Sequence, residues 1–299
     1  MRLTRAFAAV VAAVAAATTA RAQSPQAAVN ELLAADRAFS AAGASGDMIE
    51  SFAAMFVDDV MMPAPPGRVA KGKDDVIAAL KANPANANSK AEWSPVRGGI
   101  SADGLHGFTF GFMTIHKPDG TAVPAKYLAY WVKGPAGWKV AAFKRAPKAP
   151  GDVARESMLP SLPPALVAPT TDRATIERHR ASLVAAEKGF SDLSNKVGLG
   201  NAFEATGNTD AINLGGGGAD FVYGNVAIAK SVGGGAPADA KPFTWSADTA
   251  FVASSGDLGV TFGLIRQNNP PAGQPAPPAF PFFTIWRKDA NGVWKYIAE

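Results

Sequence analysis

The chain has 299 residues, with 29 Lys and Arg against 25 Asp and Glu, and 47% of its residues are hydrophobic. This apolar content is typical of a packed globular protein and excludes a wholly disordered chain. The sequence contains no cysteine, which excludes disulfides, thiolate nucleophiles and cysteine metal ligands together.

The first 22 residues have the pattern of a secretory signal peptide. Arg2 and Arg5 precede an alanine- and valine-rich run from Phe7 to Thr19, and Ala20-Arg21-Ala22 then offers a small-x-small cleavage site. A membrane-spanning helix is the alternative, but it needs about 20 apolar residues. We therefore expect cleavage after Ala22, a periplasmic or secreted protein, and no membrane attachment after cleavage.

Removal of this segment changes the electrostatics of the chain. It takes away three arginines, which leaves 26 basic and 25 acidic residues and a net charge of about +1. No run of Lys and Arg with interleaved aromatic residues follows in the mature chain. Because such a run is the electrostatic footprint of nucleic-acid binding, we expect no nucleic-acid partner.

In chain order, helices come first and strands follow. Ser24 and Pro25 predict the start of a first helix, and Asp47 to Glu50 predicts a capping box for a second one. A short strand is predicted from Val60 and a third helix over 73–82. Alternating and turn-bounded segments then predict strands over 91–98, 107–116, 125–133 and 138–145. This order is an α+β plan with an antiparallel meander.

The same pattern occurs twice. The segment around Phe39 reappears around Phe190, 151 residues later. The Gly-x-Thr-Phe-Gly motif that ends at Gly111 reappears ending at Gly263, 152 residues later. We predict a first domain over 23–148 and a second, divergent domain over 172–299. The proline-rich stretch 149–171 is interpreted as a linker, and the alternative is an arm packed on the first domain.

Two glycine-rich runs, 215–218 and 233–235, distinguish the second copy from the first. A phosphate-binding loop would also need a Lys-Ser/Thr pair that opens a helix, and that pair is absent. We therefore interpret the runs as flexible loops, and we expect the first copy, with its ordered turns, to hold any ligand.

Several motifs of the first copy resemble one known family. The residues are Asp36 to Phe39, Gly46-Asp47, Phe56 to Asp59, Gly72-Lys73, Trp93 to Pro95, Ser101 to Gly111 and Trp131 to Val140. The chain resembles the SnoaL-like branch of the nuclear transport factor 2-like superfamily, in two tandem copies. The resemblance implies two cone-shaped domains, each a curved antiparallel sheet wrapped by about three helices around an apolar cavity. It also implies pairing of cones, so an intrachain pseudo-dimer or a homo-oligomer is expected.

Ketosteroid isomerase shares the implied fold, but its catalytic groups are missing here. Its tyrosine position corresponds to Phe39 and its aspartate position to Ala64, with Phe190 and Gly215 in the second copy. Phenylalanine has no hydroxyl to hold an oxyanion, and alanine and glycine have no base. The sequence therefore argues against that isomerase chemistry.

One carboxylate remains a candidate catalytic residue. Asp36 lies on the apolar stripe of the first helix with Leu32 and Phe39, and Glu187 repeats this arrangement beside Phe190. A carboxyl group that faces an apolar cavity has a raised pKa and can act as an acid or a base. The alternative is a structural carboxylate paired with a strand cation or with backbone donors.

The remaining site predictions concern the cavity wall. The expected pocket-lining residues are Phe39, Met62, Trp93, Thr109, Met113, Tyr127, Glu187 and Phe190. No His, Asp and Glu grouping has metal-ligand spacing, so no metal and no cofactor are expected. The leading hypothesis is an exported protein that binds a small apolar molecule. The alternatives are a lyase, cyclase or isomerase that uses Asp36 as general acid or base, and a protein-interaction module.

Overall fold

The computed structural model describes residues 23–65, 67–151, 157–216, 218–270, 273 and 277–299. The predicted signal peptide lies outside these residues. None of the helices described is long and apolar enough to cross a bilayer.

The first repeat contains α1 (Pro25–Ser45), α2 (Met48–Met55), β1 (Phe56–Ala64), β2 (Arg68–Lys71), α3 (Lys73–Lys81), β3 (Lys90–Ile100), β4 (His106–His116), β5 (Ala122–Gly134) and β6 (Gly137–Pro147). The predicted caps are present. Ser24 Oγ accepts from the amide of Ala27 at 3.1 Å, and Asp47 Oδ1 accepts from Ile49 at 2.9 Å and from Glu50 at 3.1 Å. The strand expected at Val60 already begins at Phe56, because α2 ends directly before it.

The second repeat has the same order of elements. It contains α4 (Arg173–Val197), α5 (Leu199–Thr206), β7 (Gly207–Asn213), β8 (Val222–Tyr223), α6 (Asn225–Ser231), β9 (Phe243–Val252), β10 (Leu258–Gln267), β11 (Phe280–Lys288) and β12 (Trp294–Ala298). The sheets correspond strand for strand, with the orders β2-β1-β6-β5-β4-β3 and β8-β7-β12-β11-β10-β9. The predicted α+β class with two tandem units is confirmed.

The predicted antiparallel sheet needs one correction in each repeat. β1 runs parallel to β6, and β7 runs parallel to β12, whereas the other paired strands are antiparallel. The reason is the connection through α3 or α6, which carries the chain to the far edge of the sheet. From β3 to β6, and from β9 to β12, the chain reverses its direction three times. β6 therefore lies beside β1, and β12 beside β7, and each pair runs in the same direction.

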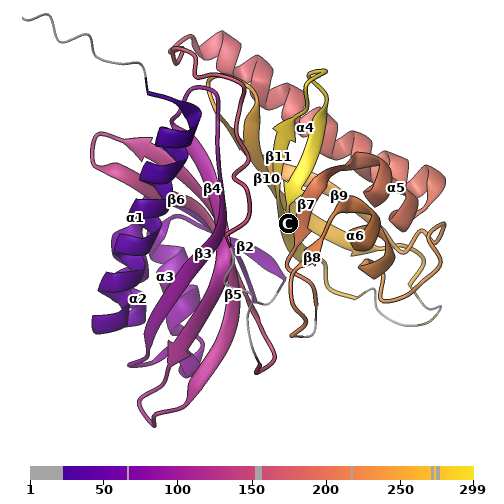
Figure 1. The fold of residues 1–299 in the computed structure, drawn as a ribbon. Coiled ribbons are helices and arrows are strands. Elements are labelled where there is room, and N and C mark those ends of the chain that lie inside the picture. The colour runs from indigo at the N-terminus through magenta and orange to yellow at the C-terminus, as the bar shows by residue number, and fades with distance from the viewer. Residues whose placement is uncertain (1–22, 66, 152–156, 217, 271–272, 274–276) are drawn as a thin grey trace, which may run out of the picture.

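The two sheets face each other, and the helices cover their outer faces. Figure 1 shows α1, α2 and α3 on one side of the molecule and α4, α5 and α6 on the other, with both sheets between them. One buried apolar cluster contains side chains of both sheets, among them Phe110, Leu128 and Tyr130 of the first and Phe262 and Ile285 of the second. Each repeat also has a separate cluster between its own sheet and helices. The molecule therefore has four layers and three apolar cores.

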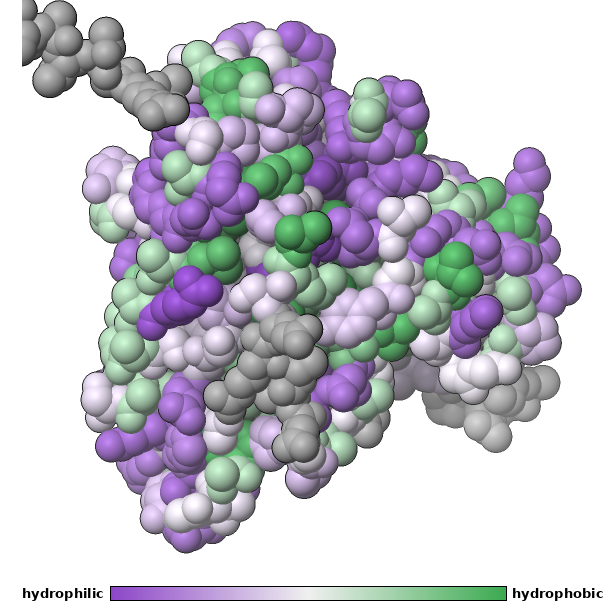
Figure 2. Space-filling view, viewed as in Figure 1, coloured by the Kyte–Doolittle hydropathy of each residue, from purple (hydrophilic) through white to green (hydrophobic). Residues whose placement is uncertain are grey.

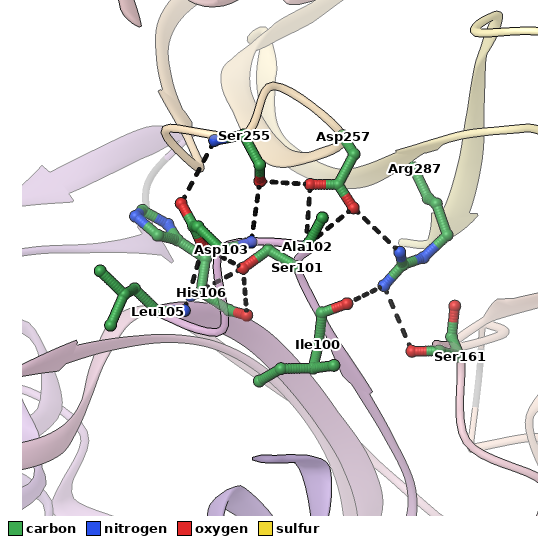
Figure 3. A network of polar contacts seen from close by, with 10 residues as sticks. All are labelled: Ile100, Ser101, Ala102, Asp103, Leu105, His106, Ser161, Ser255, Asp257 and Arg287. Atoms are coloured by element: carbon green, nitrogen blue, oxygen red, sulfur yellow. Dashed lines mark hydrogen bonds and ion pairs between the residues drawn. The ribbon is translucent and has the colours of Figure 1, made fainter. Parts of the chain in front are cut away.

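At one end of this interface, the loops after β3 and β9 bind each other (Figure 3). Asp103 accepts from the hydroxyl of Ser254 at 2.8 Å, and Asp257 accepts from the amide of Ala102 at 3.1 Å. Arg287 donates to the carbonyl of Ile100 at 2.7 Å and to Asp257 at 3.3 Å. Asp103 and Asp257 thus each satisfy donors of the opposite repeat, which fixes the register of the two sheets.

Elsewhere in the interface, the first repeat supplies cations and the second supplies acceptors. Arg97 binds the side chain of Asp210, and Lys148 lies 3.2 Å from Asp220. Lys126 is fully buried and donates to the carbonyl oxygens of Leu214 and Ala219, on either side of the run 215–218. The residues on either side of this run are therefore held by a lysine of the other repeat.

The predicted linker also contacts the first sheet. Ser161 forms a parallel bridge with Gly99, and its amide and carbonyl bond to Gly98 at 3.0 Å and to Ile100 at 3.0 Å. β3 is an edge strand with free backbone groups, and this extended segment satisfies several of them. The segment around Ser161 thus packs on the first sheet, as the alternative interpretation expects.

Candidate functional site

Asp36 is buried between α1 and the first sheet, with 0% of its surface exposed. Its Oδ1 accepts from the indole nitrogen of Trp93 at 2.6 Å, and its Oδ2 accepts from the hydroxyl of Tyr127 at 2.8 Å. Burial raises the pKa of Asp36, and these two hydrogen bonds oppose the rise. Asp36 therefore joins the first helix to two strands, β3 and β5.

Glu187 repeats this arrangement in the second repeat with different partners. Its Oε1 accepts from Trp245 Nε1 at 2.6 Å, and its Oε2 accepts from Thr261 at 2.5 Å and from Trp286 at 3.0 Å. The longer glutamate reaches Thr261 and Trp286, because the position of Tyr127 is taken here by Phe282, which has no hydroxyl. Burial likewise raises the pKa of Glu187.

These contacts favour the structural interpretation of Asp36, whereas Glu187 also lines the cavity of the second repeat. Each oxygen already accepts from at least one buried donor, and Asp36 does not line the cavity found beside Trp93 and Met113. A base needs an open path to its substrate. The catalytic role of Asp36 stays a prediction, and we give its test in the Discussion.

The cavity with a predominantly apolar lining lies in the second repeat, opposite to the expectation from its glycine-rich loops. It has a volume of about 270 Å³. Its walls carry the aromatic side chains of Phe190, Phe203, Phe243, Trp245, Phe280 and Phe282. Aromatic and aliphatic walls with a few polar groups are typical of small-molecule sites, and the volume is near the lower end of their range.

Two aromatic positions of the first core are replaced in this repeat. In the first repeat, the ring of Phe143 on β6 packs 5.1 Å from that of Phe52 and 5.7 Å from that of Phe56. The strand registers place Gly207 at the position of Phe56 and Glu299 at the position of Phe143. The ring of Tyr296, at the position of Val140, fills the space beside Gly207. At the position of Phe143 no ring is present, and the carboxyl group of Glu299 lines the cavity instead.

Polar groups in the cavity come from both repeats. Glu299 Oε1 accepts from Asn213 Nδ2 at 2.6 Å, and Lys144 reaches the cavity from β6 of the first repeat. Burial raises the pKa of Glu299 to about 7, and burial lowers the pKa of Lys144. At neutral pH the cavity thus contains a carboxyl group near its midpoint of titration and a desolvated amine.

The other predicted pocket residues occupy several environments. Trp93 and Met113 line a more polar cavity of about 310 Å³ at one edge of the first sheet. Thr109 is buried and accepts from Trp131 Nε1 at 2.8 Å, and Met62 is buried in the first core. Phe39 packs with its ring centroid 6.0 Å from that of Trp131. Among the predicted pocket residues, Glu187 and Phe190 line the second-repeat cavity.

The cavity residues that sequence reasoning missed include Lys144, Asn213 and Glu299. The signal for Glu299 is present, because aligning the repeats on Trp138 and Trp294 places an acid opposite Phe143. Lys144 has no such signal, since it belongs to the other repeat and is brought to the cavity only by the pairing of the sheets.

In the part of the chain that the structure describes, no three His, Asp or Glu side chains form a group that could hold a metal ion. The large apolar side chains exposed in this part are Leu159, Val167, Tyr223, Val226, Phe280 and Val293. On the face that Figure 2 displays, green areas are small and separated by purple ones. A protein-interaction module would be favoured by a contiguous apolar patch, and this face offers none.

No protein-family model matches the chain, and no curated protein matches it. Similar solved structures include a ketosteroid isomerase-like protein from Erwinia carotovora atroseptica, with 22% identity, 40% of this chain and 99% of that chain covered, and a TM-score of 0.31. A second is a putative dehydratase of the NTF2-like family from Streptomyces avermitilis, with 20% identity, 41% and 97% covered, and a TM-score of 0.32. A third is an NTF2-like protein from Novosphingobium aromaticivorans, with 17% identity, 41% and 81% covered, and a TM-score of 0.30.

Proposed function

We propose that this chain is an exported protein that binds a small, largely apolar molecule in the cavity of its second repeat. The observation that carries the proposal is the combination of about 270 Å³ of space, an aromatic wall and a few convergent polar groups. A molecule of this kind would place its apolar part against the rings and its polar atoms near Glu299 and Asn213.

Binding can be followed through Trp245, whose side chain lines the cavity. We expect 1-anilinonaphthalene-8-sulfonate to change tryptophan fluorescence and to raise the melting temperature. Ile265→Phe fills the cavity and is expected to weaken binding by at least about tenfold, because a bulky substitution removes the space for the ligand.

The matched control is Met113→Phe, at the equivalent position of the first repeat. This variant is expected to bind the probe as the wild type does, and circular dichroism of both variants checks their folding. Loss of binding in Met113→Phe together with normal binding in Ile265→Phe would contradict the proposal. It would move the ligand site to the first repeat.

Export is supported by the pattern of the first 22 residues alone. We expect protein isolated from the periplasm or the medium to begin at Gln23, which mass spectrometry of the intact chain measures. Retention of residues 1–22 in a membrane fraction would contradict this part of the proposal. Native mass spectrometry of the same material tests directly whether a small molecule is retained.

A further inference from the structure

Lys144 reaches a cavity that belongs to the other repeat. It follows Phe143 on β6, whose ring lies in the core of the first repeat. Successive residues of a strand point to opposite faces, so Lys144 lies on the face that meets the second sheet. There its side chain lines the same cavity as Glu187 and Glu299.

The other cations on this face are already paired. Lys126 donates to two carbonyl oxygens, Lys148 lies 3.2 Å from Asp220, and Arg97 binds Asp210. Lys144 differs, because no described residue accepts a hydrogen bond from its Nζ or forms an ion pair with it. The other pairs attach the repeats to each other, whereas Lys144 lines a space large enough for a ligand.

The surroundings of this amine suit nucleophilic chemistry. Burial lowers the pKa of Lys144, which increases the fraction of neutral amine at pH 7. Glu299 lines the same cavity, and burial raises its pKa to about 7, so that it can both give and take a proton near neutrality. The attraction between Lys144 and Glu299 opposes both shifts.

We propose that Lys144 forms a reversible imine with an apolar aldehyde or ketone held in this cavity, and that Glu299 acts as the proton donor and acceptor. The inference rests on the proposed function, since the same cavity must hold the carbonyl compound. The neutral amine attacks the carbonyl carbon and forms a C–N bond, and the nitrogen proton passes to the former carbonyl oxygen. Glu299 then protonates the hydroxyl group, which leaves as water while the C=N bond forms. Hydrolysis reverses each step.

The test traps the imine with benzaldehyde as probe and sodium cyanoborohydride as reductant, at pH 7, on the full mature chain. Peptide mapping by mass spectrometry then gives the initial alkylation rate of each lysine, with the exposed Lys90 as internal standard. We expect Lys144 to react at least about tenfold faster than Lys90, because the cavity holds the aldehyde beside its amine and burial lowers its pKa. Benzyl alcohol has no carbonyl group, so it should slow the alkylation of Lys144 by occupying the cavity and leave the alkylation rate of Lys90 unchanged.

Glu299→Gln separates the proton-transfer role from simple binding. It should slow the alkylation of Lys144 by about a hundredfold, without changing Lys90 and without lowering the melting temperature at pH 7. Ile265→Phe should make the alkylation of Lys144 no faster than that of Lys90, because the larger side chain fills the cavity.

Two results would overturn the inference. They differ in whether the proposed ligand site is retained. If benzyl alcohol raises the melting temperature but Lys144 reacts no faster than Lys90, imine formation is wrong and apolar binding is retained. If benzyl alcohol and benzaldehyde both leave the melting temperature unchanged and Lys144 shows no advantage, both the imine and the ligand site are wrong.

Discussion

Glu299 occupies in the second repeat the position that Phe143 occupies in the first. In both repeats the residue follows the last parallel pairing with the first strand, Met61 with Ala142 and Ile212 with Ala298. In one repeat the position completes an aromatic core, and in the other it supplies a carboxyl group to a cavity. The exchange between these equivalent positions therefore replaces a packed ring with a carboxyl group that lines a cavity.

Because of this difference, replacement by alanine is expected to lower the free energy of unfolding by unequal amounts at the two positions. Phe143→Ala is expected to lower the free energy of unfolding by about 3–5 kcal/mol, because it opens a cavity in a close-packed core. At about pH 4.5, where the carboxyl group is protonated, Glu299→Ala enlarges an existing cavity and removes one hydrogen bond, so a loss of about 1 kcal/mol is expected. Urea denaturation of both variants measures the two values, and equal losses would contradict the contrast between the repeats.

The structural interpretation of Asp36 predicts a loss of stability. Asp36→Leu leaves the indole of Trp93 and the hydroxyl of Tyr127 without their acceptor, and about 2–4 kcal/mol of unfolding free energy is expected to be lost. Asp36→Asn keeps one acceptor and should lose about 1 kcal/mol. Asp58→Asn, at a fully exposed side chain, is the control and should change little. A catalytic Asp36 would give the reverse result, with an unchanged melting temperature for Asp36→Asn and the loss of turnover of any substrate identified.

Glu299 predicts a specific dependence of stability on pH. Its pKa is raised to about 7 in the folded chain from the ordinary 4.5, so the folded chain keeps a proton that the unfolded chain releases between these values. The contribution of Glu299 to the free energy of unfolding therefore falls as the pH rises from about 4.5 to about 7. Above that window the full cost of burying the charged carboxylate is present.

Glu299→Gln removes this penalty, so the variant should exceed the wild type in stability above pH 7 by on the order of 1–3 kcal/mol. The two proteins should converge below about pH 4.5. Denaturant titrations across the range measure the difference, with the exposed Glu204→Gln as control. A pH-independent difference would show that Glu299 is not desolvated.

The interface predicts that the repeats unfold together. Arg287 is 7% exposed, and its replacement by leucine leaves Asp257 and the carbonyl oxygen of Ile100 without this donor. We expect Arg287→Leu to cost about 3 kcal/mol, and the exposed Arg266→Leu to stay within about 0.5 kcal/mol. The wild type should show one transition, because one apolar cluster is shared by both sheets. Two transitions in the wild type would contradict this shared core.

The sequence determined the local structure and the duplication. Capping residues such as Ser24 and Asp47 act within one helical turn, and the alternation of apolar residues along a strand sets which face is buried, so both are visible without the fold. The repeated register around Phe39 and Phe190 likewise established two copies of one unit.

Only the tertiary structure decided where the cavity lies and which groups enter it. The sequence correctly placed Asp36 on the inner face of its helix. Whether its carboxylate oxygens were free to accept from a ligand depended on Trp93 and Tyr127, which lie on distant strands. Lys144 and Glu299 are 155 positions apart and meet only because the two sheets pack face to face. Local patterns report the preferences of a short segment, whereas burial and the pKa shifts that follow from it depend on every segment packed around a group.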